Sequence, residues 1–490
     1  MSTGIESATG NVWATFSSAA GVLVGLSERR DQTGKQLGTM SISPARAAAY
    51  AILLRVEQQD SYASELLHST RCEELTAADR GLATELVMGT LRWRSSLDSV
   101  IDNASSQRLD KLDPEVLTAL RLGVYQLGWL DRIPGRAAIH ESVELVKRAR
   151  KRSAVPFANA VLRKLADSLT PGKRFIDAIA TAATTTALAS ASAHPEWLLQ
   201  SWVTQFGLDV ARSVCSYDQT IPVTALRLRT AAAEEELEHA GVELAAGVLL
   251  ANARRVLSGD VTKTAAFREG RVAIQDEASQ LVAALVGQGA RILDCCAAPG
   301  GKTWIIADRN PEATIVAAEL HQHRAELLRR RISAQNVQVV TTDVRELPVH
   351  ELFDRVLVDV PCSGTGTLAR NPEIKWRLQS SDLADLHSRQ VAILNAAMNH
   401  VKPQGRLVYS TCSLEKEEDE SVVEEVLQTN SSFRLRDSRA ELEHLRNEGV
   451  LVATDLSSLV HGAYLRTIPG VHLCDGFFVA MLERQELRPG

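Results

Sequence analysis

The chain has 490 residues, which is too long for a single hydrophobic core, so we expect roughly two to four domains. Its composition, 45% hydrophobic and 23% charged, is typical of a soluble globular protein. No apolar stretch approaches the roughly 20 residues that a membrane-spanning helix needs, so no membrane contact is expected. The formal net charge of −6 excludes a protein that is basic over its whole surface, so any contact with nucleic acid must come from a local patch.

The N-terminus and the cysteines both bear on the compartment. Residues 1–40 hold a short apolar patch without the leading basic residues of a signal peptide, and Met40 opens the first helical pattern. We therefore expect residues 1–40 to be a disordered tail, unless the start of the chain is misassigned. The absence of a C-x-x-C pair disfavours a zinc knuckle or a disulfide framework and favours the reducing cytoplasm. The cysteines are Cys72, Cys215, Cys295, Cys296, Cys362, Cys412 and Cys474.

Residues 41–170 are predicted to form a bundle of helices. Segments such as "AADRGLATELVMGTLRWRSSLDSVI" and "PEVLTALRLGVYQLGWL" carry apolar residues at helical spacing, and Pro44 and Pro114 stand near helix starts. Between Arg121 and Lys164 there are ten lysines and arginines against three acids. This local basic excess fits an RNA-binding surface, and it fits an ordinary solvated helix face equally well.

Two further segments precede the C-terminal part of the chain. Residues 171–193 are poor in charge and rich in Ala, Thr and Ser, so a linker is predicted, although the alanines could also support a helix. Residues 194–275 combine a helix, "PEWLLQSWVTQFG", with strand-like pieces such as "VTALRLRT" and "RVAIQD". This mixture predicts a small α+β module.

Between residues 276 and 490, short β-rich runs alternate with helical stretches. The runs are "ARILDCCA", "ATIVAAE", "VQVVTTD", "FDRVLVDVP" and "GRLVYSTCS". Such alternation is typical of a parallel sheet with helices on both faces, in which ligands bind at the carboxyl ends of the strands. The fold class expected for this part is therefore α/β.

The stretch "ILDCCAAPGGKTW", residues 292–304, contains the G-K-T ending of a phosphate-binding loop. A Walker A loop also needs a glycine five residues before Gly301, where this chain has Cys296, so a triphosphatase is disfavoured. The alternative is a tight turn at Gly300 and Gly301, between a strand and a helix, that lets a nucleoside approach the backbone closely.

Acidic residues end the strands that follow: Glu319, Asp343 and Asp359. Each acid alone is commonly a solvated strand cap, but the three together would repel a pyrophosphate. They suit a nucleoside with a neutral or cationic tail, because ribose hydroxyls, an adenine amine and a sulfonium all favour acceptor groups. These acids therefore predict S-adenosylmethionine as the ligand.

Two cysteines also follow strand ends, Cys362 in "VDVPCSGTGT" and Cys412 in "YSTCSLEKEEDE". A lone cysteine is usually a small buried hydrophobe, but a pair at the ligand-binding edge of one sheet favours chemistry. These loops supply no further His or Cys, so no metal is expected. Thiols beside a methyl donor suit methylation of cytosine at C5, in which a thiolate adds to C6 of an unstacked base and activates C5. Asp359 would then hold the polar edge of the base.

Several motifs resemble those of a known family. "DCCAAPGGKT", "DVPCSGTGT", "RNPEIKW", "STCSLEKEEDE" and "DGFFVAML" resemble the motif series of the Sun-type bacterial 16S rRNA (cytosine-5)-methyltransferases. "IPGRAAIHESVELVK" and "FANAVLRK" resemble a NusB-like RNA-binding domain, and the resemblance covers residues 44–484. It implies an all-α NusB-like bundle (41–170), a linker (171–193), a small α+β, RRM-like connecting module (194–275) and a Rossmann-like class I methyltransferase domain (276–490).

The resemblance also implies roles for individual residues. The nucleophile is the cysteine of the S-T-C-S motif, Cys412, and the cysteine of the P-C motif, Cys362, assists product release; spacing alone does not assign these two roles. Lys302 is expected near the active site together with Asp359, with helix capping or packing as the alternative for the lysine. The donor-binding residues that the resemblance implies are Cys296, Ala297, Ala298, Pro299, Gly300, Gly301, Lys302, Glu319, Asp343 and Asp359.

Three positions depart from the family pattern. Glu319 stands where many relatives carry Asp, which lengthens the reach to a ribose but keeps the acceptor. The stretch "LRLRT" lacks the Asn that is usual at its end, which leaves substrate contacts there open. Cys295 replaces a small or aliphatic residue and is interpreted as core filler.

We therefore expect a cytoplasmic, monomeric enzyme that transfers a methyl group from S-adenosylmethionine to C5 of a specific cytidine in 16S rRNA, through a covalent bond between Cys412 and C6. Two alternatives stay open. One is the same chemistry on transfer RNA, which the NusB-like segment disfavours. The other is a non-catalytic RNA-binding or antitermination-type factor, which the intact Cys362 and Cys412 disfavour.

Overall fold

The computed structural model describes residues 42–59, 61–69, 72, 74–169, 174–347 and 351–486. The chain divides into two compact units, Met1–Gly172 and Lys173–Gly490. The predicted N-terminal tail, residues 1–40, lies outside the described residues. Within the described residues no helix is long and apolar enough to cross a membrane.

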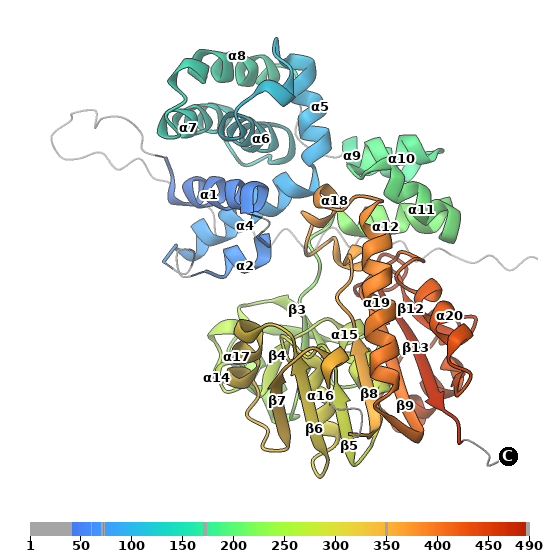
Figure 1. Ribbon diagram of the computed structural model, residues 1–490. Helices are drawn as coiled ribbons and strands as arrows, with labels where there is room; N and C mark the ends of the chain where they lie inside the picture. Colours follow the sequence, from blue (N-terminus) through green and yellow to red (C-terminus); the bar gives the residue numbers. More distant parts are fainter. Residues whose placement is uncertain are drawn as a thin grey trace, which may run out of the picture. The chain divides into compact units, whose positions relative to one another are not determined.

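The first unit is all helical, as predicted (Figure 1). The α-helices are α1 (Pro44–Gln59), α2 (Ala63–Leu67), α4 (Ala77–Arg92), α5 (Arg94–Ala104), α6 (Pro114–Trp129), α7 (Gly135–Arg148) and α8 (Val155–Ala166), with 3-10 turns at Leu109–Lys111 and Arg152–Ala154. Thr76 caps α4 by accepting from the backbone N–H of Asp79. Pro114 opens α6, where the N–H that proline lacks would have no partner within the helix.

The second unit begins with four helices. They are α9 (Arg174–Thr181), α10 (Thr185–Ser192), α11 (Glu196–Phe206) and α12 (Leu208–Asp218). The alanine-rich stretch for which a linker was predicted thus contains helical turns, the alternative that its alanines left open. Thr184 caps α10 by accepting from the N–H of Ala187.

A small antiparallel sheet follows, in the strand order β2-β3-β1-β4, with helices between its strands. Its core is a cluster of aliphatic side chains that includes Leu226, Leu237 and Val272. This is the predicted α+β, RRM-like module. Its elements are β1 (Ala225–Leu228), α13 (Ala232–His239), β2 (Glu243–Ala246), β3 (Ala253–Ser258), α14 (Ala265–Arg268) and β4 (Val272–Ile274).

The C-terminal part of this unit is built on a larger mixed sheet, in the order β11-β12-β13-β9-β8-β5-β6-β7, with β10 paired to β13. Strands β5 to β9 run parallel, and β13 runs antiparallel to β9. The strands are β5 (Arg291–Asp294), β6 (Thr314–Glu319), β7 (Val337–Thr341), β8 (Phe353–Asp359), β9 (Val401–Thr411), β10 (Phe433–Leu435), β11 (Val460–His461), β12 (Tyr464–Thr467) and β13 (Phe477–Arg484).

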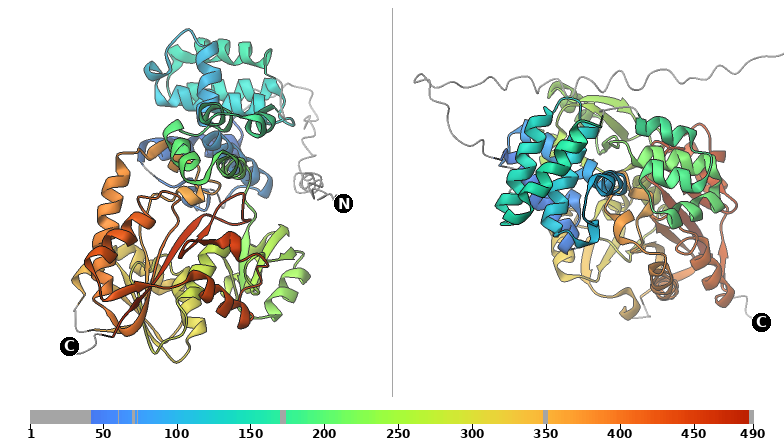
Figure 2. Two further views of the ribbon diagram at one scale, coloured as in Figure 1. Left: turned by 90° about the vertical axis from the view of Figure 1, so that its right-hand side faces the viewer. Right: turned by 90° about the horizontal axis from the view of Figure 1, so that it is seen from above.

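Helices cover both faces of the large sheet (Figure 2). On one face α15 (Glu277–Leu285), α16 (Gly301–Arg309), α17 (Gln322–Arg331) and α21 (Ser438–Asn447) bury apolar side chains. On the other face lie α19 (Asp382–Met398) and α20 (Glu420–Thr429), and the short α18 (Ile374–Arg377) precedes α19. The central strands are apolar on both sides because both sides are covered. The predicted doubly covered, Rossmann-like sheet is confirmed.

Candidate active site

The turn that opens α16 brings the backbone close to its neighbours. Gly300 has φ +104°, and a Cβ at this position would lie 2.6 Å from Cδ1 of Leu328. Only glycine fits both the left-handed backbone and the close approach. At Gly301, a Cβ would lie 3.2 Å from the side chain of Gln275. The loop 295–300 can therefore run close to the sheet edge before the helix begins.

Asp294 ends β5 beneath this loop and is fully buried. Thr303 donates a hydrogen bond from Oγ1 to Oδ2 of Asp294 at 2.7 Å, while Oδ1 has no hydrogen-bond partner in the described part of the chain. Burial raises the pKa of the Asp294 carboxyl to about 7. Our sequence prediction did not include Asp294 among the site residues, although it is the first letter of the motif "DCCAAPGGKT".

The three predicted acids line one cavity of about 240 Å³, together with Cys296, Ala298 and both catalytic candidates Cys362 and Cys412. Glu319 is buried and accepts the backbone N–H of His321 at 2.9 Å. Asp343 is held by Arg345, and the hydrogen bond from this guanidinium lowers the pKa of the Asp343 carboxyl. The acids at successive strand ends are thus brought together, as parallel strands require.

A second cavity, of about 660 Å³, lies on the other side of the loop. The loop residues Ala297, Pro299, Gly300, Gly301 and Lys302 line it, and so do side chains of the small module. Cys296, Ala298 and Asp359 line both cavities. These three residues therefore form a wall common to the two cavities, and the cysteine pair lines the smaller cavity.

Lys302 forms an ion pair with Asp359, so its side chain does more than cap or pack on its own helix. Its Nζ is 2.7 Å from Oδ2 of Asp359 and 5.0 Å from the centre of the Phe477 ring. Ser410, which pairs with Asp359 across β8 and β9, donates from Oγ to Oδ1 at 2.7 Å. Burial acts to lower the pKa of Lys302, but the Asp359 carboxylate outweighs it and the net shift is upward. The lysine is therefore a fixed ammonium group.

The two cysteines from separate strand ends are in contact. The Sγ atoms of Cys362 and Cys412 lie 3.2 Å apart, and the backbone N–H of Cys412 points to Sγ of Cys362 at 3.3 Å. The hydrogen bond to Cys412 raises the pKa of Cys362 well above its usual value, and burial adds to this. Cys295, by contrast, is buried in the core among apolar side chains, in agreement with its interpretation as core filler.

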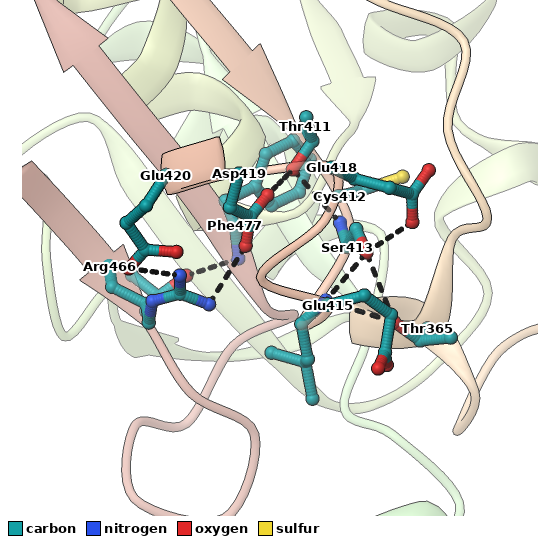
Figure 3. A network of polar contacts seen from close by, with 12 residues as sticks. Thr365, Thr411, Cys412, Ser413, Glu415, Glu418, Asp419, Glu420, Arg466 and Phe477 are labelled. Atoms are coloured by element: carbon teal, nitrogen blue, oxygen red, sulfur yellow. Dashed lines mark hydrogen bonds and ion pairs between the residues drawn. The ribbon is translucent and has the colours of Figure 1, made fainter. Parts of the chain in front are cut away.

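A buried polar network supports the loop that carries Cys412 (Figure 3). Arg466, which is 1% exposed, forms ion pairs with Asp419 at 2.9 Å and Glu420 at 2.8 Å. Thr411 donates from Oγ1 to Asp419 at 2.5 Å, which ties the residue before Cys412 to this pair. None of these three charged residues was singled out from the sequence, although Asp419 and Glu420 stand in the motif "STCSLEKEEDE".

The basic segment of the first unit is only partly a surface patch. Arg121 is buried and donates to Asp98 from Nε at 2.6 Å, so it serves the interior of the bundle. The exposed cations of the segment are Arg132, Arg136, Lys147, Arg148, Arg150, Arg152, Arg163 and Lys164. The ten basic residues counted from the sequence therefore include at least one, Arg121, that cannot contact RNA phosphates.

Two family models match the chain. One, described as 16S rRNA methyltransferase RsmB/F, matches residues 283–483, and the other, the NusB family, matches residues 43–167. A relative from Bacillus subtilis named "Probable ribosomal RNA small subunit methyltransferase B" is 33% identical over 461 residues, which cover 91% of this chain and 100% of the relative. The ribosomal RNA small subunit methyltransferase B of Pseudomonas syringae is 31% identical, with 90% of this chain and 97% of the relative covered.

Solved structures share the fold. The crystal structure of PH0851 superposes with a TM-score of 0.74 at 24% identity, covering 91% of this chain and 100% of that chain. NSun6 from Pyrococcus horikoshii, solved with SFG, gives a TM-score of 0.51 at 19% identity, covering 60% of this chain and 98% of that chain. At these identities the likeness concerns the fold alone. On the sequence relationships, the chain belongs to the 16S rRNA methyltransferase RsmB/F family and carries an N-terminal NusB-family domain.

Proposed function

We propose that this protein transfers a methyl group from S-adenosylmethionine to C5 of a cytidine in 16S rRNA, through a covalent bond between Cys412 and C6 of the base. The observation that carries the proposal is the contact between two thiols, 3.2 Å apart, in the smaller cavity that the three acids also line. A single thiol would suffice for nucleophilic addition. A second thiol in contact with it suits a reaction in which the covalent bond must afterwards be broken.

The residues that suit S-adenosylmethionine line the smaller cavity and the adjoining part of the larger one. Glu319 and Asp343 offer acceptors for ribose hydroxyls and for an adenine amine. The buried, unpartnered Oδ1 of Asp294 offers an acceptor for an ammonium group from the side of the larger cavity. Gly300 and Gly301 let the backbone at the start of α16 run close to Leu328 and Gln275, and both glycines line the larger cavity. When bound, S-adenosylmethionine supplies an electrophilic methyl group.

Cys412 is proposed as the nucleophile. Its thiolate forms a bond to C6, the C5–C6 double bond opens, and electron density moves to C5, which then accepts the methyl group. In the final step a general base takes up the C5 proton, the C5–H electron pair re-forms the double bond, and the C6–S bond breaks, so the Cys412 thiolate is regenerated. Cys362, whose sulfur touches that of Cys412, is placed to assist this release.

Asp359 and Lys302 are proposed to hold the base. Asp359 lines both cavities and is fixed by Lys302 and Ser410, so its carboxylate has a defined position at the end of β8. A fixed carboxylate can accept a hydrogen bond from the exocyclic amine of cytosine or bond to a protonated N3. The Lys302 ammonium adds positive charge where the base gains electron density on addition of the thiolate.

The larger cavity is proposed as the path of the RNA. Arg268, Arg330 and Arg331 line it, and in the described part of the chain no carboxylate forms an ion pair with them. Trp304 also lines it, with the guanidinium of Arg229 over its ring at 4.7 Å. Exposed guanidinium groups that are free to bind phosphates suit the backbone of an unstacked single strand. The exposed cations of the NusB-family domain are proposed to bind RNA phosphates as well.

The test is methyl transfer to unmodified 16S rRNA with labelled donor by three proteins: the wild type, Cys412→Ala and Cys362→Ala. We expect transfer by the wild type, no transfer by Cys412→Ala, and a covalent protein–RNA complex with Cys362→Ala that survives denaturing electrophoresis. Cys72→Ala, which removes a buried thiol of the first unit, is the matched control and should transfer normally. Full activity of Cys412→Ala would contradict the proposal, and a transfer RNA substrate in parallel separates the two substrate classes.

A further inference from the structure

Glu418 is a fully buried carboxylate in the turn between β9 and α20. It accepts four hydrogen bonds: from the backbone N–H of Ser363 at 2.8 Å, from Oγ of Ser363, from Oγ of Ser413 at 2.6 Å and from Nε2 of Gln390 at 2.9 Å. No lysine, arginine or histidine of the described ranges forms an ion pair with it. Four hydrogen-bond donors offset the cost of removing this carboxylate from water, but they do not neutralise its negative charge.

These hydrogen bonds join the two cysteine loops through a single side chain. Ser363 directly follows Cys362, and Ser413 directly follows Cys412. The two serine hydroxyls are also 3.1 Å apart, and both donate to the same Oε2 of Glu418. Figure 3 shows Ser413 beside Glu418. A displacement of Glu418 would therefore move both loops and change the distance between the two sulfur atoms.

Gln390 anchors this arrangement to helix α19. Its Nε2 donates to Glu418 and also to the backbone carbonyl of Pro361, at 3.0 Å, immediately before Cys362. Glu418 lines neither of the two cavities. Glu418 therefore has no place to touch the donor or the RNA, and any effect on the reaction must act through the cysteines.

The charges around the two thiols are unequal. Glu418 brings a negative charge to the loop of Cys362, and this charge adds to the hydrogen bond and the burial that raise the pKa of that thiol. On the opposite side, Lys302 brings an ammonium group towards Cys412, and the negative charge of Cys412 is one cause of the raised pKa of Lys302. The surroundings of the two thiols therefore differ in charge, although Glu418 is hydrogen-bonded to the residue after each cysteine.

We propose that Glu418 is a positioning residue that holds the loops of Cys362 and Cys412 together and so sets the contact between the two sulfur atoms and the charge around them. This inference rests on the proposed function for the roles of the two cysteines. It supplies what spacing along the chain could not, namely a physical reason why two cysteines from separate strand ends stay in contact.

Other ionisable groups face the same turn and would contribute to any pH profile of the thiols. Because Glu418→Gln leaves all of them in place, a change in that profile reports on Glu418. These groups are Lys302 and Asp359 from α16 and β8, Tyr409 on β9, Glu415 and Asp419 in the turn, His387 on α19, and Arg466 on β12.

The experiment is alkylation of the full-length protein with iodoacetamide between pH 6 and 9, with the modified cysteines mapped by peptide mass spectrometry. In the wild type we expect Cys412 to react first. In Glu418→Gln we expect the rate at Cys362, relative to Cys412, to rise about tenfold, because loss of a neighbouring charge is worth roughly one pKa unit. Glu417→Gln, an exposed neighbour in the same turn, should behave as the wild type.

The methyl-transfer kinetics give a second readout. Glu418→Gln should lower kcat about tenfold or more and leave KM for the donor and for RNA unchanged, because Glu418 lines neither cavity. A folded Glu418→Gln protein with the wild-type ratio of alkylation rates at Cys362 and Cys412 would overturn the inference. The alkylation needs no RNA, so its result does not depend on which base the protein methylates.

If Glu418→Gln does not fold, Ser363→Ala carries the test. It removes one hydroxyl from Oε2 and keeps the charge and the backbone hydrogen bond at Oε1. Several-fold lower kcat at unchanged KM is the expected result. An unchanged kcat in this variant would show that the link between the loops does not matter and would reject the proposal.

Discussion

Glu415 links helix α11 to the loop that carries Cys412, and its ionisation should make the stability of the protein depend on pH. The carboxyl is fully buried and accepts hydrogen bonds from Nε1 of Trp202 at 2.9 Å and from Oγ of Ser201 at 3.0 Å. Burial raises its pKa from the ordinary 4.5 to about 7. The perturbation is Glu415→Gln, which keeps the shape and cannot ionise.

The sign follows from proton binding. Between pH 4.5 and 7 the folded protein holds a proton on Glu415 that the unfolded chain has lost, so the stability of the folded state falls as the pH rises through this window. A difference of about 2.5 pKa units corresponds to roughly 3 kcal/mol once both states are ionised, and about 2–3 kcal/mol of this develops between pH 5 and pH 8. Glutamine carries no such penalty at any of these pH values.

The assay is urea denaturation of the wild type and Glu415→Gln at several pH values from 5 to 8. Asp294 and Asp475 also have pKa values raised to about 7 by burial, but their contribution is common to both proteins and cancels in the difference. We expect the variant to gain about 2–3 kcal/mol relative to the wild type on going from pH 5 to pH 8. A difference that stays constant over this range would refute the argument, and the exposed Glu417→Gln should show no trend.

Three further changes test other parts of the account. Lys302→Met removes the cation that fixes Asp359, so kcat should fall about a hundredfold with a much smaller change in KM for the donor; wild-type kcat would contradict the role of the pair. Glu319→Gln weakens an acceptor of the smaller cavity, so KM for the donor should rise about tenfold at similar kcat, and an unchanged KM would remove Glu319 from the donor site. Arg466→Met leaves Asp419 as a buried charge without its main cation, so urea denaturation should show a loss of about 3–5 kcal/mol; Arg466→Met with Asp419→Asn should recover most of it, and failure to recover would contradict the coupling.

The residues at the carboxyl ends of the strands could be predicted because their neighbourhood follows from the fold class. Once β5, β6 and β8 are parallel neighbours, their final acids must share one edge of the sheet, and Asp359 and Glu319 do so. The same reasoning places the loops of Cys362 and Cys412 at that edge. Local patterns were sufficient here because each strand contributes one short, recognisable end.

Contacts between distant segments could not be predicted in this way. Glu418 stands in a run of acids that looks like a solvated surface, and only the structure shows it buried between two loops. Arg121 looked like part of a basic patch, but its guanidinium pairs with Asp98 inside the bundle. Burial of a charged side chain depends on partners far away along the chain, and a pattern of neighbouring residues carries no information about them.

The central claim is that the methyl group goes to C5 of cytidine with Cys412 as the nucleophile. The most direct test uses 16S rRNA made with cytidine that carries tritium at C5, together with unlabelled S-adenosylmethionine. Methylation at C5 must expel the C5 hydrogen, so we expect one tritium released to water for each methyl group transferred, and no release by Cys412→Ala. Methyl transfer without release of tritium would contradict the account.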